Sequence, residues 1–384
     1  MVDLVCLYYP QQLLPSLAAV KFLQKQKNFY LEKLIVFVWL PNGMAHALKE
    51  NRKAFFKKAL SIMAGTQLVF SDEIQEFQKS GHFTSVLKKA KILKKYFGQQ
   101  QIARFYYSHD LTSDFISQAF MQGFPKSYKV SFGDGFGLFY DKKHFEKQFF
   151  PINDFSQASI KNVLSRIKRA WSVMSCSQVF DADMLLGILP QEASSNCFHN
   201  KHVQTIDKKI VLDLNNQFMK IFEQDDDVFD GEQKKYVFLM GSYSESKLMS
   251  LEQELNLYAD VFAKHIPQKS MIMLKTHPAA HPEKLKQLLN RFENVYQMFE
   301  ISSSDMPIEW MINLLNHAQV ISFSYASISL KYLYDIQVIH ALTQEQIDLY
   351  FYTKAILWMS ESNQMYLDKI QDLENQFSSI HENA

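Results

Sequence analysis

Residues 271–278 read Met271-Ile272-Met273-Leu274-Lys275-Thr276-His277-Pro278, and segments of this form decide the fold of the chain. The first four residues form a short, uninterrupted apolar run, which is typical of a strand buried on both faces of a sheet. Polar residues follow where the run ends, and a proline then turns the chain. Apolar runs of the same kind recur along the sequence, at 4–9, 34–39, 67–70, 103–107, 128–132, 235–240, 319–323 and 336–340.

Segments with apolar residues at helical spacing separate many of these runs, at 13–23, 246–264, 307–316 and 328–334. Strands that alternate with helices indicate parallel sheets covered on both faces. The alternation weakens over 146–210, which is irregular and polar, and an acidic connector occupies 223–231 before the pattern restarts at Lys235. The sequence therefore predicts an α/β fold with two Rossmann-like domains and a deep cleft between them.

The expected domain bounds follow this break in the pattern. The first domain covers 1–210 and includes the irregular segment, and the second covers 211–360. Residues 361–384 are expected to form a helix that packs back on the first domain. The length of 384 residues agrees with two domains, because single domains most often have about 100–150 residues.

Composition excludes several classes of protein. Apolar residues make up 47% of the chain and charged residues 21%, which is typical of a folded protein. The net charge of +1 gives no overall field that would attract nucleic acid. The three cysteines, Cys6, Cys176 and Cys197, are an odd number without a Cys-x-x-Cys pair, so we expect neither a disulfide framework nor a zinc site. No signal-peptide pattern and no apolar stretch of about 18 residues is present, and we expect a cytoplasmic protein.

Ligands of open α/β sheets bind at the carboxyl ends of the strands, so the residues that follow the apolar runs are the candidates for chemistry. Gly133-Asp134-Gly135 follows the run 128–132. The two glycines permit a tight turn and close approach of another molecule, and the carboxylate of Asp134 is a candidate general base. The alternative is an ordinary Asp-Gly turn without a role in catalysis.

A lysine and a histidine, Lys275 and His277, follow the apolar run that ends at Leu274. Lys275 can pair with a phosphate as a point charge, and His277 can donate a proton near neutral pH. The alternative is a surface loop with solvated side chains. Gly241 and Ser242 follow the run 235–240 in the same way, so we expect them to line the same edge of the sheet.

Two further groups lie close to predicted helix starts. Hydroxyl groups surround the start of the helix at 328–334, at Ser322, Ser324 and Ser327. Hydroxyls and free backbone N–H groups at a helix N-terminus form an anion site, although an ordinary serine N-cap is the alternative. Glu309 follows Pro307 at another helix start and can reach sugar hydroxyls; the alternative is an acidic first-turn residue favoured by the helix dipole.

Taken in order, these groups resemble the motifs of bacterial sialyltransferases of the GT-B fold, including lipooligosaccharide sialyltransferases and capsular polysialyltransferases. That family has an acidic motif ending in glycine, a His-Pro motif and a Ser/Thr pair. The matching residues here are Gly133-Asp134-Gly135, Lys275-Thr276-His277-Pro278, and Ser324 with Ser327. The strand 4–9 followed by Pro10-Gln11-Gln12 is also similar to the start of such chains. The chain departs from the pattern at Gly133, where many members have a second acid.

The resemblance implies a glycosyltransferase that moves sialic acid from CMP-sialic acid to a hydroxyl of a bacterial surface glycan, in a capsule or lipooligosaccharide. It implies that Asp134 takes the proton from the attacking hydroxyl and that His277 stabilises or protonates the departing phosphate. It also implies that Ser324 and Ser327 hold that phosphate and that the other donor contacts come from Lys275, Pro278, Glu309, Ser322, Gly241 and Ser242. The expected reaction inverts the anomeric carbon; a retaining outcome would remove the base role from Asp134.

No metal or other cofactor is expected. The leaving group carries one phosphate, and hydroxyls, a helix N-terminus and one histidine can stabilise its charge. Asp225 and Asp227 form an Asp-x-Asp pattern that serves as a metal site in other glycosyltransferases, but they lie in a charged connector typical of a solvated segment.

Candidate acceptor contacts are more scattered. The resemblance places Gln11 and Gly135 near the acceptor. The run 88–95 is rich in lysine, at Lys88, Lys91 and Lys95 among others, and a second basic cluster lies at 166–169. These residues can follow an acidic glycan or contact the inner face of an anionic cell membrane; the alternative is a solvated helix face.

Two alternatives to this function remain open from the sequence. The motifs contact phosphate and nucleotide, so they do not distinguish sialic acid from other CMP-activated sugar acids, such as pseudaminic, legionaminic or Kdo-type sugars. The second alternative is a non-catalytic nucleotide- or glycan-binding protein on the same fold.

Overall fold

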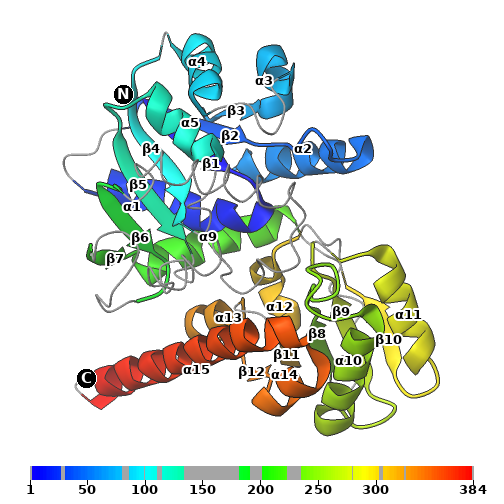
Figure 1. The fold of residues 1–384 in the computed structure, drawn as a ribbon. Helices are drawn as coiled ribbons and strands as arrows, with labels where there is room; N and C mark the ends of the chain where they lie inside the picture. The colour runs from blue at the N-terminus through cyan, green and yellow to red at the C-terminus, as the bar shows by residue number, and fades with distance from the viewer. Residues whose placement is uncertain are drawn as a thin grey trace. The chain divides into compact units, whose positions relative to one another are not determined.

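The apolar runs of the first half of the chain form one parallel sheet, and those of the second half form another (Figure 1). The computed structural model describes residues 2–26, 31–79, 86–98, 100–109, 115–133, 181–190, 201–222, 235–278, 280–301, 306–323 and 326–382, with side chains of the last helix described to 375. The chain divides into two units, Met1–Ile221 and Phe222–Ala384.

The first sheet has seven parallel strands in the order β3-β2-β1-β4-β5-β6-β7. Its strands are β1 (Val2–Leu7), β2 (Lys33–Val38), β3 (Gln67–Phe70), β4 (Ile102–Ser108), β5 (Tyr128–Gly133), β6 (Met184–Gly187) and β7 (Val203–Thr205). The last two strands lie in the stretch 146–210, which the sequence predicted to be irregular. That prediction was wrong for β6 and β7 because both are very short, and β7 buries only Val203, which leaves no periodic pattern.

Helices cover both faces of this sheet. Figure 1 shows α4 (Val86–Phe97) and α5 (Phe115–Gly123) on the side of the strands away from α1 (Leu13–Gln24) and α9 (Lys208–Ile221). The described part of the unit also contains α2 (His46–Leu60), the short α3 (Gln75–Lys79) and two 3-10 helices, Pro10–Gln12 and Ser71–Glu73. Alternate residues of the central strands, such as Leu4 and Cys6, pack with α4 and α5 in one continuous core.

The second sheet has five parallel strands in the order β10-β9-β8-β11-β12. Its elements are β8 (Lys235–Leu239), α10 (Leu251–His265), β9 (Met271–Lys275), α11 (Pro282–Phe292), β10 (Gln297–Glu300), α12 (Ile312–Leu315), β11 (Ala318–Ser322), α13 (Ala326–Tyr334), β12 (Val338–His340), α14 (Gln344–Tyr350) and α15 (Thr353–Glu382). The prediction of an α/β fold with two Rossmann-like parts is therefore confirmed.

Two helices differ from those expected. The helix expected at 246–264 begins at Leu251, because Ser250 caps it with a hydrogen bond from the Gln253 backbone N–H. The helix expected at 307–316 is a 3-10 turn, Ile308–Met311, followed by the single turn of α12.

The units divide after Ile221 rather than after residue 210, because α9 is one unbroken helix that runs past residue 210 and contacts α1 in the first unit. The final helix starts at Thr353, earlier than the expected 361. Its described contacts include hydrogen bonds to α13 in its own unit, between Tyr332 and the Ile370 carbonyl and between Lys331 and Glu374. Packing of this helix on the first unit stays a prediction.

A buried ion pair joins two neighbouring strands of the first sheet. Arg104 Nε lies 2.7 Å from Asp3 Oδ1, and the Tyr106 hydroxyl donates to the other carboxylate oxygen over 2.9 Å. Asp3 is completely buried. Burial raises the pKa of Asp3, and the two hydrogen bonds oppose that rise. The carboxylate therefore depends on both partners to remain charged inside the unit.

We expect Asp3→Ala to lower the free energy of unfolding of the first unit by about 3–5 kcal/mol, since it leaves the Arg104 guanidinium buried without its counter-charge. Urea unfolding followed by fluorescence measures the loss. The matched control is Glu76→Ala, which removes the partner of Lys95 in a pair whose side chains are 55% and 74% exposed; it should cost less than about 1 kcal/mol. Equal losses for the two variants would contradict the prediction.

Candidate functional site

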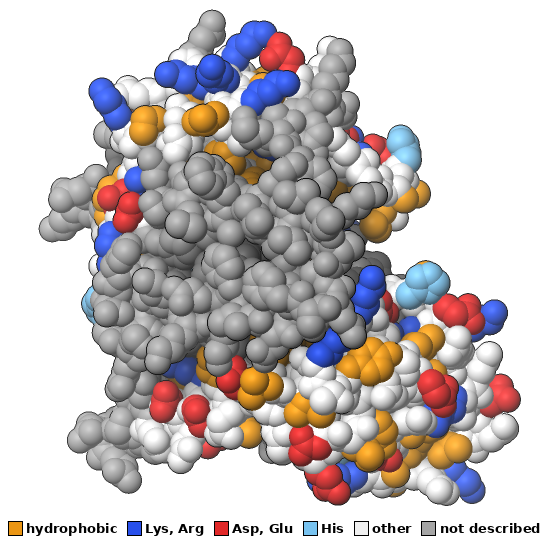
Figure 2. Space-filling model, viewed as in Figure 1, with side chains coloured by type: hydrophobic (Ala, Val, Ile, Leu, Met, Phe, Trp, Pro, Cys, Tyr) orange, Lys and Arg blue, Asp and Glu red, His pale blue; other side chains and the backbone are white. Residues whose placement is uncertain are grey.

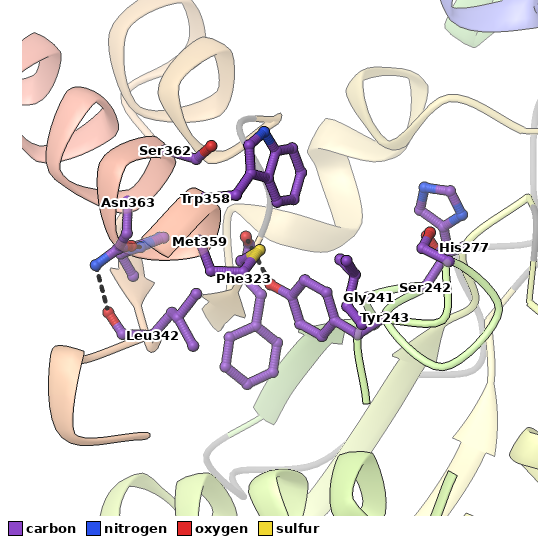
Figure 3. Close-up of a pocket in the computed structure, with 13 residues that line it drawn as sticks. Gly241, Ser242, Tyr243, His277, Phe323, Leu342, Trp358, Met359, Ser362 and Asn363 are labelled. Atoms are coloured by element: carbon purple, nitrogen blue, oxygen red, sulfur yellow. Dashed lines mark hydrogen bonds between the residues drawn. The ribbon is translucent and has the colours of Figure 1, made fainter. Parts of the chain in front are cut away.

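A pocket of about 210 Å³ lies at the carboxyl edge of the second sheet (Figure 3). Gly241 lies just beyond β8, His277 just beyond β9, and Phe323 directly after β11, while His340 is the last residue of β12. Because all five strands run in the same direction, these residues meet at one edge. The pocket therefore lies where ligands bind in open parallel sheets, and the described residues that line it belong to the second unit.

Helix α15 forms the far wall of the pocket. Its contribution comes from one helix face, at Trp358, Met359, Ser362 and Asn363. Asn363 Nδ2 donates a hydrogen bond to the Leu342 carbonyl over 3.4 Å, and Asn363 Oδ1 lies 2.8 Å from His340 Nε2. These bonds fix the helix to the segment that follows β12.

The walls of the pocket are largely apolar, with polar side chains between the apolar groups. Tyr243, Phe323 and Trp358 contribute rings, and the Tyr243 hydroxyl donates to the Phe323 carbonyl over 3.4 Å. Ser242 and His277 face the pocket beside one another in Figure 3. An apolar cavity with a small set of polar groups is typical of sites for small molecules and nucleotides.

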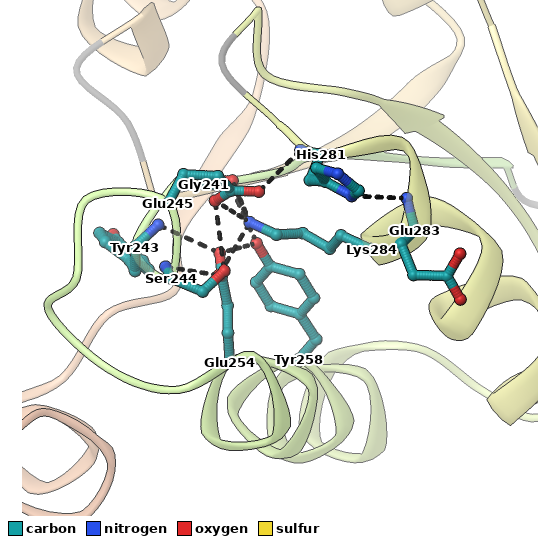
Figure 4. Close-up of polar contacts among 9 residues, drawn as sticks. All are labelled: Gly241, Tyr243, Ser244, Glu245, Glu254, Tyr258, His281, Glu283 and Lys284. Carbon is teal, nitrogen blue, oxygen red and sulfur yellow. Dashed lines mark hydrogen bonds and ion pairs between the residues drawn. The ribbon is translucent and has the colours of Figure 1, made fainter.

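The loop after β8 owes its shape to a buried ion pair between α10 and α11 (Figure 4). Lys284 Nζ lies 2.8 Å from Glu254 Oε2, and the two side chains are 1% and 0% exposed. Glu254 also accepts hydrogen bonds from the backbone N–H groups of Tyr243 and Ser244, over 3.3 and 2.9 Å. Lys284 donates to the Gly241 carbonyl over 3.2 Å. The ion pair thus holds the backbone of Gly241, Tyr243 and Ser244 in the loop that lines the pocket.

Two more side chains complete this network. The Tyr258 hydroxyl donates to Glu254 over 2.6 Å and accepts from the Gly241 backbone N–H over 3.0 Å. Glu245 lies 2.6 Å from Lys284 and accepts from the backbone N–H of His281 over 2.9 Å. Burial would raise the pKa of Glu245, but the hydrogen bonds from Lys284 and His281 outweigh it and the pKa lies below its usual value.

The half-buried His277 lies between this network and the pocket. Burial lowers its pKa, and the positive charges of Lys284 and Lys275 lower it further. The lowered pKa favours the neutral imidazole at pH 7. A phosphate placed beside it would supply negative charge and raise its pKa, which favours the protonated imidazole that can donate a hydrogen bond to the phosphate.

Three of the residues predicted from sequence line the pocket: Gly241, Ser242 and His277. The other described donor candidates lie close in the fold but are not among the lining residues. Lys275 and Ser322 are buried at the ends of β9 and β11, and Pro278 is exposed. Glu309 accepts a hydrogen bond from Ser329 over 3.1 Å, and the hydroxyl of Ser327 is hydrogen-bonded to that of Tyr366.

Several other predictions concern the first unit or undescribed residues. Asp134, Gly135, Ser324, the cluster 166–169 and the acidic connector lie outside the described residues. Gln11 is exposed after β1, and Lys88, Lys91 and Lys95 are exposed on α4. The roles proposed for all of these residues stay predictions.

No pattern in the sequence indicated that α15 would line a pocket. Ser362 and Asn363 lie in a helix whose pattern differs little from that of an ordinary amphipathic helix. Phe323 and His340 were detectable in principle, because each stands at the end of a predicted strand.

Two successive Rossmann-like units, with a pocket at the carboxyl edge of the second sheet, define a nucleotide-binding α/β protein of the GT-B type. The model of the family Alpha-2,8-polysialyltransferase (POLYST) matches residues 17–343. The chain belongs to this family and is a glycosyltransferase, which implies a nucleotide-sugar donor and a glycan acceptor.

Solved structures with some likeness to the chain were also found. UDP-GlcNAc 2-epimerase from Methanocaldococcus jannaschii has 11% identity and a TM-score of 0.49, with 88% of this chain and 83% of that chain covered. A ugt transferase from Siraitia grosvenorii in complex with UDP has 11% identity and a TM-score of 0.45, with 92% and 84% covered. Comparison with curated proteins gave no match. Within the part of the chain that the structure describes, no helix has the length and apolar character needed to cross a membrane.

We expect Lys284→Met to lower the free energy of unfolding of the second unit by about 3–5 kcal/mol, because it leaves the Glu254 carboxylate buried and uncompensated. Arg291→Met is the matched control on the same helix, since Arg291 pairs with the exposed Glu252 over 3.2 Å, and it should cost less than about 1 kcal/mol. Denaturant unfolding measures both variants. A loss for Lys284→Met no greater than that of the control would refute a structural role for the buried pair.

Proposed function

We propose that the chain transfers sialic acid from CMP-sialic acid and that the pocket of the second unit binds this donor. The observation that carries the proposal is the position of His277, beside Gly241 and Ser242 at the carboxyl edge of the sheet, in a member of the polysialyltransferase family. The aromatic walls offer flat surfaces against which a base or sugar ring can pack.

The donor phosphate would lie between His277 and the start of α13. Ser322 ends the strand that leads to this helix, and Ser324 and Ser327 stand at the helix start in the sequence. The helix N-terminus and the nearby cation of Lys275 both favour an anion. Pro278 turns the chain beside the phosphate, and Glu309 is the candidate contact to the ribose hydroxyls.

The proposed reaction is a direct displacement that inverts the anomeric carbon. The acceptor hydroxyl oxygen attacks this carbon, the bond from the carbon to the phosphate oxygen breaks, and the hydroxyl proton passes to Asp134. CMP leaves with the bonding electron pair, and His277 stabilises the charge by a hydrogen bond or by giving up a proton. These groups supply the stabilisation without a metal ion.

Family membership favours a glycosyltransferase over a non-catalytic binding protein. Transfer of another CMP-activated sugar acid is the second candidate within this proposal. Such a sugar would use the same contacts to phosphate and nucleotide, so only the products distinguish the two.

We expect the wild-type protein to release CMP from CMP-sialic acid in the presence of a sialylated glycan, and to do so equally well in EDTA. Asp134→Ala and His277→Ala should each reduce turnover by about 100-fold or more, the usual size of a general acid–base contribution, while both variants stay folded. Chromatography of CMP and mass spectrometry of the products from a panel of CMP-sugars make the measurement. No turnover with any donor in the panel would sink the proposal, and full activity of His277→Ala would remove its role.

Helix α4 is the candidate contact surface for an anionic acceptor chain. Its inner face is buried in the core, whereas Lys88, Lys91, Lys94 and Lys95 are exposed. Figure 2 shows blue side chains gathered at the top of the view, where Figure 1 has α4. A row of cations on one helix face can follow a chain of carboxylates or contact an anionic membrane surface at the inner face of the cell membrane.

We expect Lys91→Glu/Lys94→Glu to raise the KM for a polysialylated acceptor by about tenfold, which is about 1.4 kcal/mol, with little change in the KM for the donor. The matched control is Lys209→Glu/Lys220→Glu, which makes the same change of net charge at exposed positions of α9. Steady-state kinetics at several salt concentrations tests this, because an electrostatic contact weakens with salt. Equal effects of the two double variants would argue against a specific acceptor surface on α4.

A further inference from the structure

A second pocket, of about 540 Å³, lies beside the loop that connects β8 to α10 in the second unit. The loop residues divide between the two pockets: 244, 245, 247, 249 and 250 line the second one, whereas 241–243, 246 and 248 line the one proposed for the donor. No described residue lines both cavities. The second pocket is therefore a separate site, and none of the described residues proposed to contact the donor lines it.

Hydrogen bonds between distant elements fix the walls of the second pocket. The backbone N–H of Tyr352, just before α15, donates to the Leu248 carbonyl over 2.9 Å. The backbone N–H of His281, just before α11, donates to Glu245 over 2.9 Å. The loop, the start of α11 and the start of α15 are thus fixed to one another around the cavity.

The acidic side chain in the wall of the second pocket is already compensated. Glu245 Oε2 lies 2.6 Å from Lys284 Nζ and accepts from the Ser244 hydroxyl over 3.2 Å. The Glu245 side chain is still 18% exposed. It can therefore accept a hydrogen bond from a ligand hydroxyl without requiring a further cation in the pocket.

The donors that remain in the second pocket favour a negatively charged ligand. His281 Nδ1 accepts a hydrogen bond from the Glu283 backbone N–H over 3.2 Å (Figure 4), so Nε2 carries the ring proton and donates. Lys247 is exposed and makes no ion pair within the described residues. The Ser250 hydroxyl accepts from the Gln253 backbone N–H over 3.1 Å, which leaves its own proton for another acceptor.

An exposed aromatic ring completes the set of groups in the second pocket. Tyr352 is 39% exposed, and Lys354 Nζ lies 6.0 Å from the centroid of its ring. The flat apolar face of a tyrosine ring offers a packing surface to the apolar face of a sugar ring. A sugar that carries a carboxylate matches this combination: it has a negative charge for Lys247, hydroxyls for the polar side chains and a face for the ring.

We propose that the second pocket is a non-catalytic binding site for an acidic glycan, the class of chain to which the enzyme adds its sugar. The proposal rests on the proposed function in taking the sugar acid to be sialic acid. Lys247 pairs with a carboxylate of the glycan, Glu245 and His281 bind its hydroxyls, and Tyr352 packs against a sugar ring. Binding at this site does not require the donor, because the two pockets share no described lining residue.

Two lysines with the same unusual backbone conformation supply a variant and its matched control. Lys247 has a φ of 59° and Lys269, in the same unit, a φ of 66°, and both are exposed. Glycine adopts such a backbone without strain. Lys247→Gly and Lys269→Gly therefore remove the same charge from similar positions, but only Lys247 lines the second pocket.

We expect Lys247→Gly to weaken binding of an α2,8-linked sialic acid oligomer about tenfold, since one hydrogen bond between charged groups is lost. Lys269→Gly should leave the dissociation constant unchanged. Isothermal titration calorimetry without donor measures both, in full-length protein that carries Lys91→Glu/Lys94→Glu so that the α4 contact contributes little. Neither glycine variant should lower the midpoint of urea unfolding.

A second variant distinguishes a sugar site from a merely basic surface. Tyr352→Leu keeps an apolar side chain but removes the flat ring. It should weaken binding of the sialic acid oligomer several-fold and leave binding of polyglutamate unchanged, because polyglutamate has carboxylates but no sugar rings.

Four results would overturn the proposal. Lys247→Gly could leave oligomer binding unchanged, or Lys269→Gly could weaken it equally. Tyr352→Leu could leave oligomer binding unchanged or weaken polyglutamate binding to the same extent. A matching loss of CMP binding in Lys247→Gly would also count against the site, because the substitution would then act through the loop on the donor pocket.

These titrations need no turnover, so they separate this proposal from the proposed function. Selective loss of oligomer binding in Lys247→Gly, without turnover of CMP-sialic acid by the wild type, would support the second site and reject the proposed donor. Turnover of CMP-sialic acid, without any effect of Lys247→Gly on oligomer binding, would do the reverse.

Discussion

The loop that lines the pocket of the second unit depends on one buried ion pair, that between Glu254 and Lys284. Removing two charges from water costs several kcal/mol per ion, and their mutual attraction offsets this only when the remaining donors and acceptors are also satisfied. Here they are, by a tyrosine hydroxyl, by two backbone N–H groups and by a carbonyl of the loop after β8. The same hydrogen bonds that satisfy the buried charges also fix the conformation of this loop. Because the loop lines the pocket, they determine the shape of the pocket as well.

The fold was predictable wherever a strand is buried on both faces. Such strands, like β1 and β9, consist of uninterrupted apolar residues, and their alternation with helices indicates parallel sheets. Two of the strands that sequence missed, β7 at one sheet edge and β10 at another, bury few side chains, so backbone hydrogen bonds to a neighbouring strand define them. The pattern of apolar side chains in the sequence cannot reveal a strand that buries few of them.

The same distinction applies to the candidate site. His277 and Gly241 were predictable because the carboxyl ends of parallel strands lie at one edge of the sheet. A residue that follows such a strand in the sequence therefore lies at this edge. Asn363 and Trp358 were not, since they depend on where α15 packs, and that follows from contacts such as the Tyr366–Ser327 hydrogen bond that connect distant parts of the sequence. The order of short motifs in the sequence predicted the functional class. The far wall of the pocket was found only in the tertiary structure.

The position of α15 late in the chain also means that, during synthesis, the pocket is completed after the second sheet. All five strands of the second sheet precede residue 341, whereas the four lining residues of α15 lie at 358–363. A nascent chain can therefore build its first unit and the whole second sheet while the cavity still lacks one side. Among the described residues that line the pocket, those of α15 leave the ribosome last, so the pocket is complete only after the whole second sheet has been translated.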